Sequence, residues 1–149
     1  MRMDYQLLFE QAKAITEGES DLICNLANLS ALLFSEVDRL NWAGFYLHKD
    51  GELVLGPFQG KVACRRIQKG KGVCGTAWRE GKSQLVENVH AFPGHIACDG
   101  ASNSEIVVSI VKNGAFLGVL DLDSPFFSRF GEEDLIGLER IAEYISELF

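Results

Sequence analysis

The segment SEIVVSIVKNGAFLGVLDLDSP, residues 104–125, decides the fold. Two apolar runs flank Lys112-Asn113-Gly114, and a short turn with Asn and Gly between such runs predicts an antiparallel hairpin. In the second run, leucines alternate with Asp121 and Asp123. Because successive side chains of a strand point to opposite faces, the leucines are expected in a core and both carboxylates on the other face. The pattern therefore predicts a sheet with one packed face and one face that carries a site.

The register of this hairpin decides whether Glu105 joins the two aspartates. A two-residue Asn113-Gly114 loop pairs Glu105 with Leu122 and puts it on the core face, whereas a turn with Gly114 as a left-handed bulge residue pairs it with Asp121. Lys-Asn-Gly suits the bulged turn, so we predict that turn and a cluster of three acids. Like charges held close do not all ionise easily, so at least one acid is expected to have a raised pKa and to donate a proton near neutral pH. The alternative is that the acids are solvated at a strand end.

The rest of the chain divides into helices and short strands. Apolar residues recur at helical spacing in three segments, residues 4–16, 20–37 and 132–149. Between them, patterns of alternation and turn residues indicate a hairpin over 41–58, strands near 61–67 and 84–87, a short helix over 73–80 and a long loop over 88–104. Strands joined by hairpins and bracketed by helices predict an α+β sandwich with helices on one sheet face.

Length, composition and charge limit the classes of protein. The 149 residues fit one domain, residues 1–149, and no apolar run is long enough to cross a membrane. The N-terminus, MRMDYQLLFEQAK, has no signal-peptide pattern, so we expect a cytoplasmic protein. The net charge is −7 and the basic residues are scattered apart from the stretch 61–71, which argues against a nucleic-acid partner. Neither a membrane nor a polyanion is an expected partner.

The four cysteines, at positions 24, 64, 74 and 98, have no CxxC spacing. Permanent disulfides are rare in the cytosol, so metal binding, redox chemistry and packing stay open. Cys98 lies in the loop segment GHIACDGAS, where small neighbours suit a thiol that must reach a substrate, although Asp99 would raise its pKa. Cys64 stands beside Arg65 and Arg66, whose charges favour a thiolate.

The other two cysteines lie on expected helices. Cys74 is expected at a helix start, where unpaired backbone N–H groups also favour a thiolate, and Cys24 inside a helix is expected to be a buried, inert residue. Zinc binding would recruit Cys64, Cys74 and Cys98 with His90 or His95. Closed zinc sites usually have ligand pairs at short spacing, which this set lacks, so we expect no metal.

Trp42 and Tyr46 are predicted to share one face of the first strand. An aromatic wall of this kind suits a thioether or a methyl group, while core packing is the alternative for either residue. If the wall lines a site, it favours a small ligand with a thioether or methyl group.

Four segments together resemble the free methionine-R-sulfoxide reductases, which are stand-alone GAF-domain enzymes: NWAGFYL, GPFQGKVACRRIQKGKGVCGTAW, NVHAFPGHIACDGASNSEIV and GVLDLDSPFFSRF. The resemblance implies a central antiparallel sheet of about six strands flanked by helices, an enclosed pocket for one free amino acid, and thioredoxin as the recycling reductant. Carried onto matching positions, it implies Cys98 as nucleophile, Cys64 as resolving cysteine, Cys74 as an accessory thiol, Glu105, Asp121 and Asp123 as the acidic cluster, and Trp42 as the aromatic wall.

The function that the resemblance implies is reduction of free L-methionine (R)-S-oxide to L-methionine through a cysteine sulfenic acid and a disulfide. No cofactor is expected beyond thioredoxin as an external reductant. A non-catalytic GAF sensor of a small molecule or of redox state is the alternative. The sequence leaves open whether the chain forms a homodimer.

Overall fold

The computed structural model describes residues 3–95 and 100–149, and its centre is an antiparallel sheet of six strands. The strands are β1 (Trp42–Lys49), β2 (Glu52–Gly60), β3 (Arg66–Ile67), β4 (Gln84–Val86), β5 (Ser104–Lys112) and β6 (Ala115–Ser124). Their spatial order is β3-β2-β1-β6-β5-β4, and every neighbouring pair is antiparallel. The third strand is shorter than the predicted 61–67, because residues 61–65 have no strand structure.

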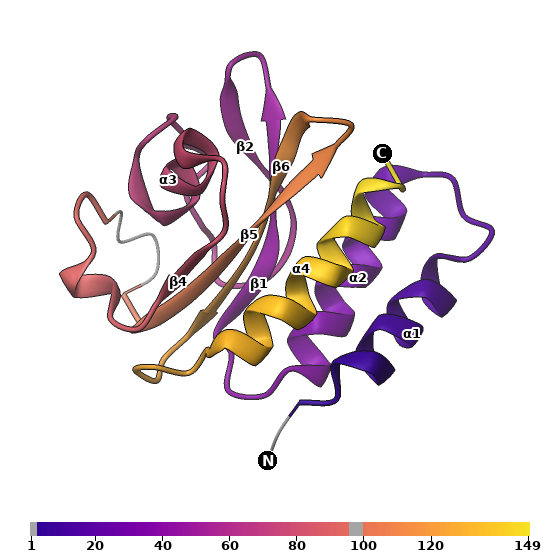
Figure 1. Cartoon of the computed structure of the whole chain (residues 1–149), viewed down its shortest axis with the longest axis horizontal. Coiled ribbons are helices and arrows are strands. Elements are labelled where there is room, and N and C mark those ends of the chain that lie inside the picture. Colours follow the sequence, from indigo (N-terminus) through magenta and orange to yellow (C-terminus); the bar gives the residue numbers. More distant parts are fainter. Residues whose placement is uncertain (1–2, 96–99) are drawn as a thin grey trace.

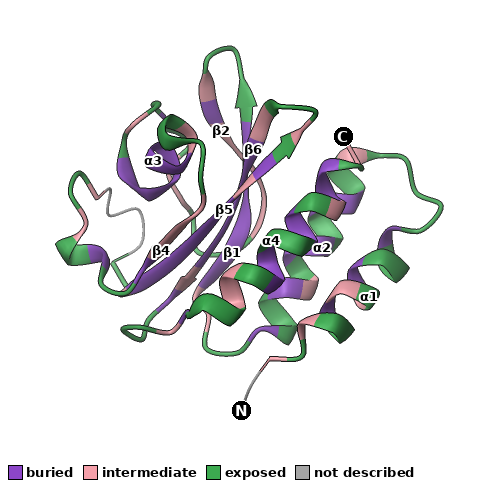
Figure 2. Cartoon of the chain, viewed as in Figure 1, coloured by how far each residue is buried: buried purple, intermediate pink, exposed green. Residues whose placement is uncertain are grey.

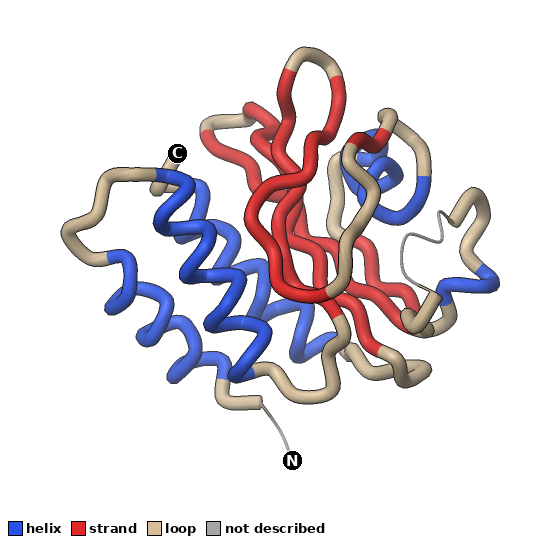
Figure 3. Tube along the Cα trace, turned by 180° about the vertical axis from the view of Figure 1, so that it is seen from behind, coloured by secondary structure: helices blue, strands red, loops and turns tan. Residues whose placement is uncertain are grey.

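Three helices lie on one side of the sheet, as Figures 1 and 3 show from opposite sides. They are α1 (Tyr5–Thr16), α2 (Leu22–Glu36) and α4 (Glu132–Ser146). The short helix α3 (Gly72–Glu80) and the 3-10 helix η1 (Val89–Ala91) lie on the other side with the connecting loops. This confirms the predicted α+β sandwich with helices on one face. Among the described residues, no helix has the length and apolar composition needed to cross a membrane.

Side-chain caps define where the first two helices begin. Asp4 accepts a hydrogen bond from the Leu7 backbone N–H at 3.0 Å, and Asp21 accepts one from Cys24 at 2.8 Å. Such caps satisfy backbone donors that have no partner within a helix. At the C-terminal helix, the Asp134 carboxylate accepts from the Gly131 N–H at 2.7 Å. These caps place the helices at the positions that their apolar spacing predicts.

The main core lies between the three helices and the sheet, where Figure 2 shows the buried sides of α2 and α4 facing the strands. Phe45, Leu120 and Leu122 from the sheet and Leu29 and Ile141 from the helices are fully buried there. A second apolar cluster lies on the opposite face under α3. Burial of large apolar side chains is the main stabilising contribution of such layers.

The β5–β6 turn differs from the prediction. Lys112 pairs with Ala115, so the loop is the two-residue Asn113-Gly114, and both residues have positive φ, as a type I′ turn requires. The register shifts by one residue farther along, because Ile110 pairs with Gly118 and Val111 with Phe116. The extra residue between these pairs is a β-bulge.

This bulge decides where Glu105 points. Without it, the two-residue turn would place Glu105 opposite Leu122 on the core face. With it, Glu105 pairs with Asp123 and Val107 with Asp121. The predicted pairing of Glu105 with Asp121 is therefore wrong, but the one-residue shift restores the parity of the strands. All three acids consequently lie on the face opposite the main core.

Candidate active site

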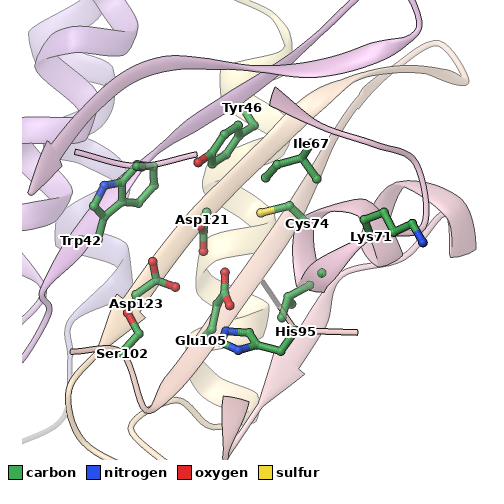
Figure 4. Close-up of a pocket in the computed structure, with 13 residues that line it drawn as sticks. Trp42, Tyr46, Ile67, Lys71, Cys74, His95, Ser102, Glu105, Asp121 and Asp123 are labelled. Carbon is green, nitrogen blue, oxygen red and sulfur yellow. The ribbon is translucent and has the colours of Figure 1, made fainter. Parts of the chain in front are cut away.

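A pocket lies on the sheet face opposite the helix layer, beside the N-terminal end of α3. Its lining includes the three acids, both predicted aromatic residues, Cys74, His95 and Ser102. Figure 4 shows the Cys74 sulfur and the carboxyl groups of Asp121, Glu105 and Asp123 directed toward a common space, with Trp42 and Tyr46 along one side. The fold thus brings together side chains that are up to 81 positions apart in the sequence, from 42 to 123.

The acids come from two adjacent strands. Glu105 lies near the start of β5, and Asp121 and Asp123 lie near the end of β6. Only 8% of Glu105 and 5% of Asp121 are exposed to solvent, whereas Asp123 is half-buried. One buried oxygen, Asp121 Oδ1, has no hydrogen-bond partner in the described part of the chain. The cluster therefore contains a buried acceptor that no described group satisfies.

Burial and mutual repulsion change the protonation of these acids. Burial raises the pKa of Glu105 well above its usual value, and the nearby Asp121 charge raises it further. Burial also raises the pKa of Asp121, with Asp123 as the next cause. This confirms the prediction that at least one member of the cluster has a raised pKa. A buried carboxyl group that keeps its proton near neutral pH is able to act as a general acid.

Cys74 lies in the first turn of α3 and is buried. Its sulfur and the carboxylate oxygens of Glu105 and Asp121 all lie within 4.8 Å of one another. Burial raises the pKa of this thiol, and the charges of Asp121 and Glu105 raise it further. The prediction that the helix N-terminus favours a thiolate here is therefore wrong. Desolvation and two adjacent acids outweigh the helix dipole.

Among the described residues, these three side chains lie close enough together to bind a cation. They differ from the set considered from the sequence, because Cys64 and His90 are not part of this group. A thiol and two carboxyl groups must lose their protons to bind a metal ion. The raised pKa values of these groups oppose that loss.

Trp42 and Tyr46 form the predicted aromatic wall on β1. Both side chains are buried, and their rings stack with centroids 5.9 Å apart and an interplanar angle of 22°. Phe58 of β2 also stacks with the Trp42 ring, with centroids 5.2 Å apart. The wall lies beside the acids on the same sheet face, because Trp42 of β1 pairs with Asp123 of β6. A ligand in the pocket therefore meets aromatic rings next to carboxyl groups.

Both aromatic residues also hold the backbone that leads to Cys64. The Trp42 Nε1–H donates to the Lys61 carbonyl at 3.1 Å, and the Tyr46 hydroxyl donates to the Cys64 carbonyl at 2.9 Å. Cys64 is half-buried and disulfide-bonded, whereas Cys24 and Cys74 are free thiols. Cys98, the predicted nucleophile, lies outside the described residues.

The exposure of Cys24 differs from the prediction. The residue lies on α2, as predicted, but on the exposed side of that helix. The buried side consists of Leu26, Leu29 and Leu33 together with small polar residues. The prediction of a buried Cys24 is therefore wrong, because packing against the sheet selects a different side of α2.

His95 is a pocket residue that was considered from the sequence only as a possible zinc ligand. It lines the pocket, and its ring lies 6.3 Å from that of His90. Burial lowers the pKa of His95, and the adjacent His90 lowers it further, which favours the neutral imidazole. His90 itself lies 2.8 Å from the Asn103 side-chain oxygen through Nε2. The sequence feature that could have placed His95 in the site is its position in the same predicted loop, residues 88–104, as Cys98.

Comparisons with known proteins agree in family and fold. The family model of the GAF domain matches residues 25–149. The chain is 56% identical over 146 residues to Protein YtsP of Bacillus subtilis (strain 168), covering 97% of this chain and 90% of that protein. It is 50% identical over 144 residues to the free methionine-R-sulfoxide reductase of Escherichia coli (strain K12), covering 97% of this chain and 87% of that protein. The structure of free methionine-R-sulfoxide reductase from Neisseria meningitidis in complex with its substrate is 42% identical with a TM-score of 0.94, covering 97% of this chain and 87% of that chain.

Proposed function

Because this chain belongs to the free methionine-R-sulfoxide reductase family of GAF-domain proteins, we propose that it reduces free L-methionine (R)-S-oxide to L-methionine. The observation that carries this proposal is the pocket in which three acids and two aromatic rings lie side by side on one sheet face. Its relatives include a free methionine-R-sulfoxide reductase with a bound substrate. The chain spans 87% of the length of each of these two relatives.

The first step is attack of the Cys98 thiolate on the sulfoxide sulfur. A carboxyl group of the cluster protonates the sulfoxide oxygen, so that methionine leaves and Cys98 becomes a sulfenic acid. The thiol and the sulfoxide are thereby converted to a sulfenic acid and a thioether, with the oxygen transferred to the cysteine sulfur. Glu105 and Asp121 support the role of proton donor, because burial raises the pKa of each.

Selectivity for the free amino acid follows from the same acids. The ammonium group of the substrate pairs with ionised members of the cluster, which lines the pocket. The sulfur and its methyl group lie against Trp42 and Tyr46. A methionine sulfoxide inside a polypeptide has an amide in place of the ammonium group, and its flanking chain does not fit a small pocket.

The second step regenerates the enzyme. The Cys64 thiol condenses with the sulfenic acid of Cys98, which forms a disulfide and releases water. Thioredoxin then reduces this disulfide in the cytoplasm, and no further cofactor takes part. The disulfide-bonded state of Cys64 supports its assignment as the resolving cysteine. The accessory role of Cys74 has less support, because its thiol is buried among acids.

The test is turnover of each free sulfoxide epimer with a thioredoxin system. We expect methionine from the R epimer with the parent, none with Cys98→Ser, and one turnover without efficient recycling with Cys64→Ser. Glu105→Gln is expected to lower kcat by about 10²-fold or more, the usual contribution of a general acid, whereas the exposed Glu36→Gln is the matched control. Tight binding of the sulfoxide without methionine formation would instead establish a non-catalytic sensor.

A further inference from the structure

The Cys64 segment, residues 61–65, joins β2 to β3 and has no regular secondary structure. Val62, in its middle, is 87% exposed. The Arg65 carbonyl accepts a hydrogen bond from the Leu55 N–H at 2.9 Å, which ties the end of the segment to β2. The carbonyls of Lys61 and Cys64 accept hydrogen bonds from side chains of β1. Because the segment has no strand or helix hydrogen bonds of its own, its position depends largely on these side-chain hydrogen bonds.

The two side chains that hold it are those of the aromatic wall. Trp42 supports the beginning of the segment through Lys61, and Tyr46 supports the cysteine itself at 2.9 Å. Their rings stack on each other and line the pocket. The stacked pair of Trp42 and Tyr46 therefore both lines the ligand pocket and holds the backbone at Cys64.

We propose that Tyr46 is a positioning residue for the resolving thiol: its hydroxyl holds the Cys64 carbonyl so that the Cys64 sulfur stays where it condenses with the sulfenic acid. This inference rests on the proposed function. The step that it accelerates forms the S–S bond, breaks the S–O bond of the sulfenic acid and releases water with the Cys64 proton. Holding one reactant in place raises its effective concentration and thus the rate of this step.

The chemistry of the contact makes the hydroxyl the necessary donor. A backbone carbonyl only accepts, so Tyr46 must keep its proton to make this bond. Burial raises the pKa of Tyr46, and Asp121 raises it further, so the phenol stays protonated through the neutral range. Tyr46→Phe removes this hydrogen bond and leaves the ring of the aromatic wall in place.

The experiment separates the two chemical steps in the absence of reductant. Reduced protein is mixed with free methionine (R)-S-oxide, and both methionine and the loss of the Cys64 thiol are followed by rapid quench, with dimedone to trap the sulfenic acid. A parallel reaction uses hydrogen peroxide, which converts a thiol to a sulfenic acid and water without any sulfoxide. Tyr144→Phe is the matched control, because its hydroxyl contacts Thr16 Oγ1 at 2.6 Å in the helix layer.

We expect Tyr46→Phe to slow disulfide formation about 3- to 10-fold relative to sulfenic acid formation, the effect of one neutral hydrogen bond of ordinary net strength. The dimedone-trapped fraction then rises in both reactions, while Tyr144→Phe behaves as the parent. A disulfide rate unchanged by Tyr46→Phe, or an effect confined to the methionine burst, would overturn the proposal. If the parent makes no methionine but the peroxide reaction slows in the variant, the proposed function fails and the positioning role stands.

Discussion

At the scale of single residues, burial rather than residue type decides protonation in the pocket. Asp121 and Cys74 have quite different usual pKa values, yet burial is the largest cause that raises the pKa of each. Repulsion among the acids adds to this effect. The site thus contains groups that are suited to donating protons. Burying these groups close together lowers the free energy of unfolding at neutral pH.

Replacing Asp121 by Asn tests whether this buried acid lowers the stability of the fold while it serves the reaction. In the folded protein the pKa of Asp121 is raised above its usual 3.8, so the native state binds more protons than the unfolded state above that pH. Its contribution to stability is full below pH 3.8 and is lost as pH rises toward the folded pKa. We expect Asp121→Asn to have a higher Tm than the parent at pH 7, by about 2–4 °C for each kcal/mol recovered, and to have lower turnover.

Thermal unfolding of both proteins from pH 4 to pH 8 measures the effect, and the difference in Tm should grow with pH. Asp50→Asn, at an exposed turn where Asn also tolerates the positive φ, should give no such trend. A Tm difference for Asp121→Asn that shrinks with rising pH would contradict the raised pKa.

Cys74 provides a second residue-scale prediction. Its thiol is 4% exposed and its pKa is raised, so little reactive thiolate is available at neutral pH. In the reduced native protein we expect iodoacetamide to label Cys74 at least about tenfold more slowly than the exposed Cys24. Peptide mass spectrometry at several labelling times gives both rates. Equal rates would show that Cys74 is accessible and would favour its use in turnover.

At the scale of elements, the β5–β6 hairpin determines the site. Its two-residue turn and its bulge together set the parity that places Glu105 beside Asp123. Gly118 lies at this bulge and approaches β1 closely, since a Cβ atom built there would lie 2.4 Å from the Tyr46 carbonyl oxygen. The bulge therefore requires a residue without a side chain at the point where it meets the strand of the aromatic wall.

We expect Gly118→Ala to lower the free energy of unfolding by about 1–3 kcal/mol, because the added methyl forces β1 and β6 apart. The same shift should raise KM, since both strands line the pocket. Denaturant unfolding and steady-state kinetics measure the two effects. Gly131→Ala is the control, because nothing lies within 4 Å of a Cβ atom there. A fully stable Gly118→Ala protein would contradict the close approach.

At the scale of the whole molecule, the sheet separates two kinds of environment. The face toward α1, α2 and α4 is apolar and carries the main core, whereas the face toward α3 carries the acids and the aromatic wall. A ligand whose ammonium group relieves repulsion in the cluster, and which binds only the folded state, stabilises that state. Binding and stability are therefore linked through the pocket.

Free L-methionine, the proposed product, provides a thermal test of this link. At 100 times its Kd a ligand stabilises the folded state by about 2.7 kcal/mol, which corresponds to a rise in Tm of about 5–10 °C. We expect that rise with L-methionine and little or none with N-acetyl-L-methionine, which lacks the ammonium group. Differential scanning calorimetry gives both values. Equal rises in Tm with the two compounds would show that the acids do not bind the amino group.

Much of the fold followed from local patterns. The helices, both hairpins and the alternation of Leu120 and Leu122 with aspartates were predicted from spacing that each segment carries by itself. The three acids and the aromatic wall were also predicted, and the structure brings them into one pocket. The turn of β5–β6 was predicted wrongly, because the bulge lies in β6 just after the second residue pair and not in the turn itself.

The sequence by itself determined which segments are helices and strands, which strand face is polar, and which residue types are able to carry thiol and acid chemistry. Tertiary structure alone decided the protonation of Cys74, the exposure of Cys24, the place of His95 and the bond from Tyr46 to Cys64. The physical reason is that periodicity acts between near neighbours in the chain. Burial, repulsion and side-chain hydrogen bonds depend instead on segments that meet only when the sheet has formed.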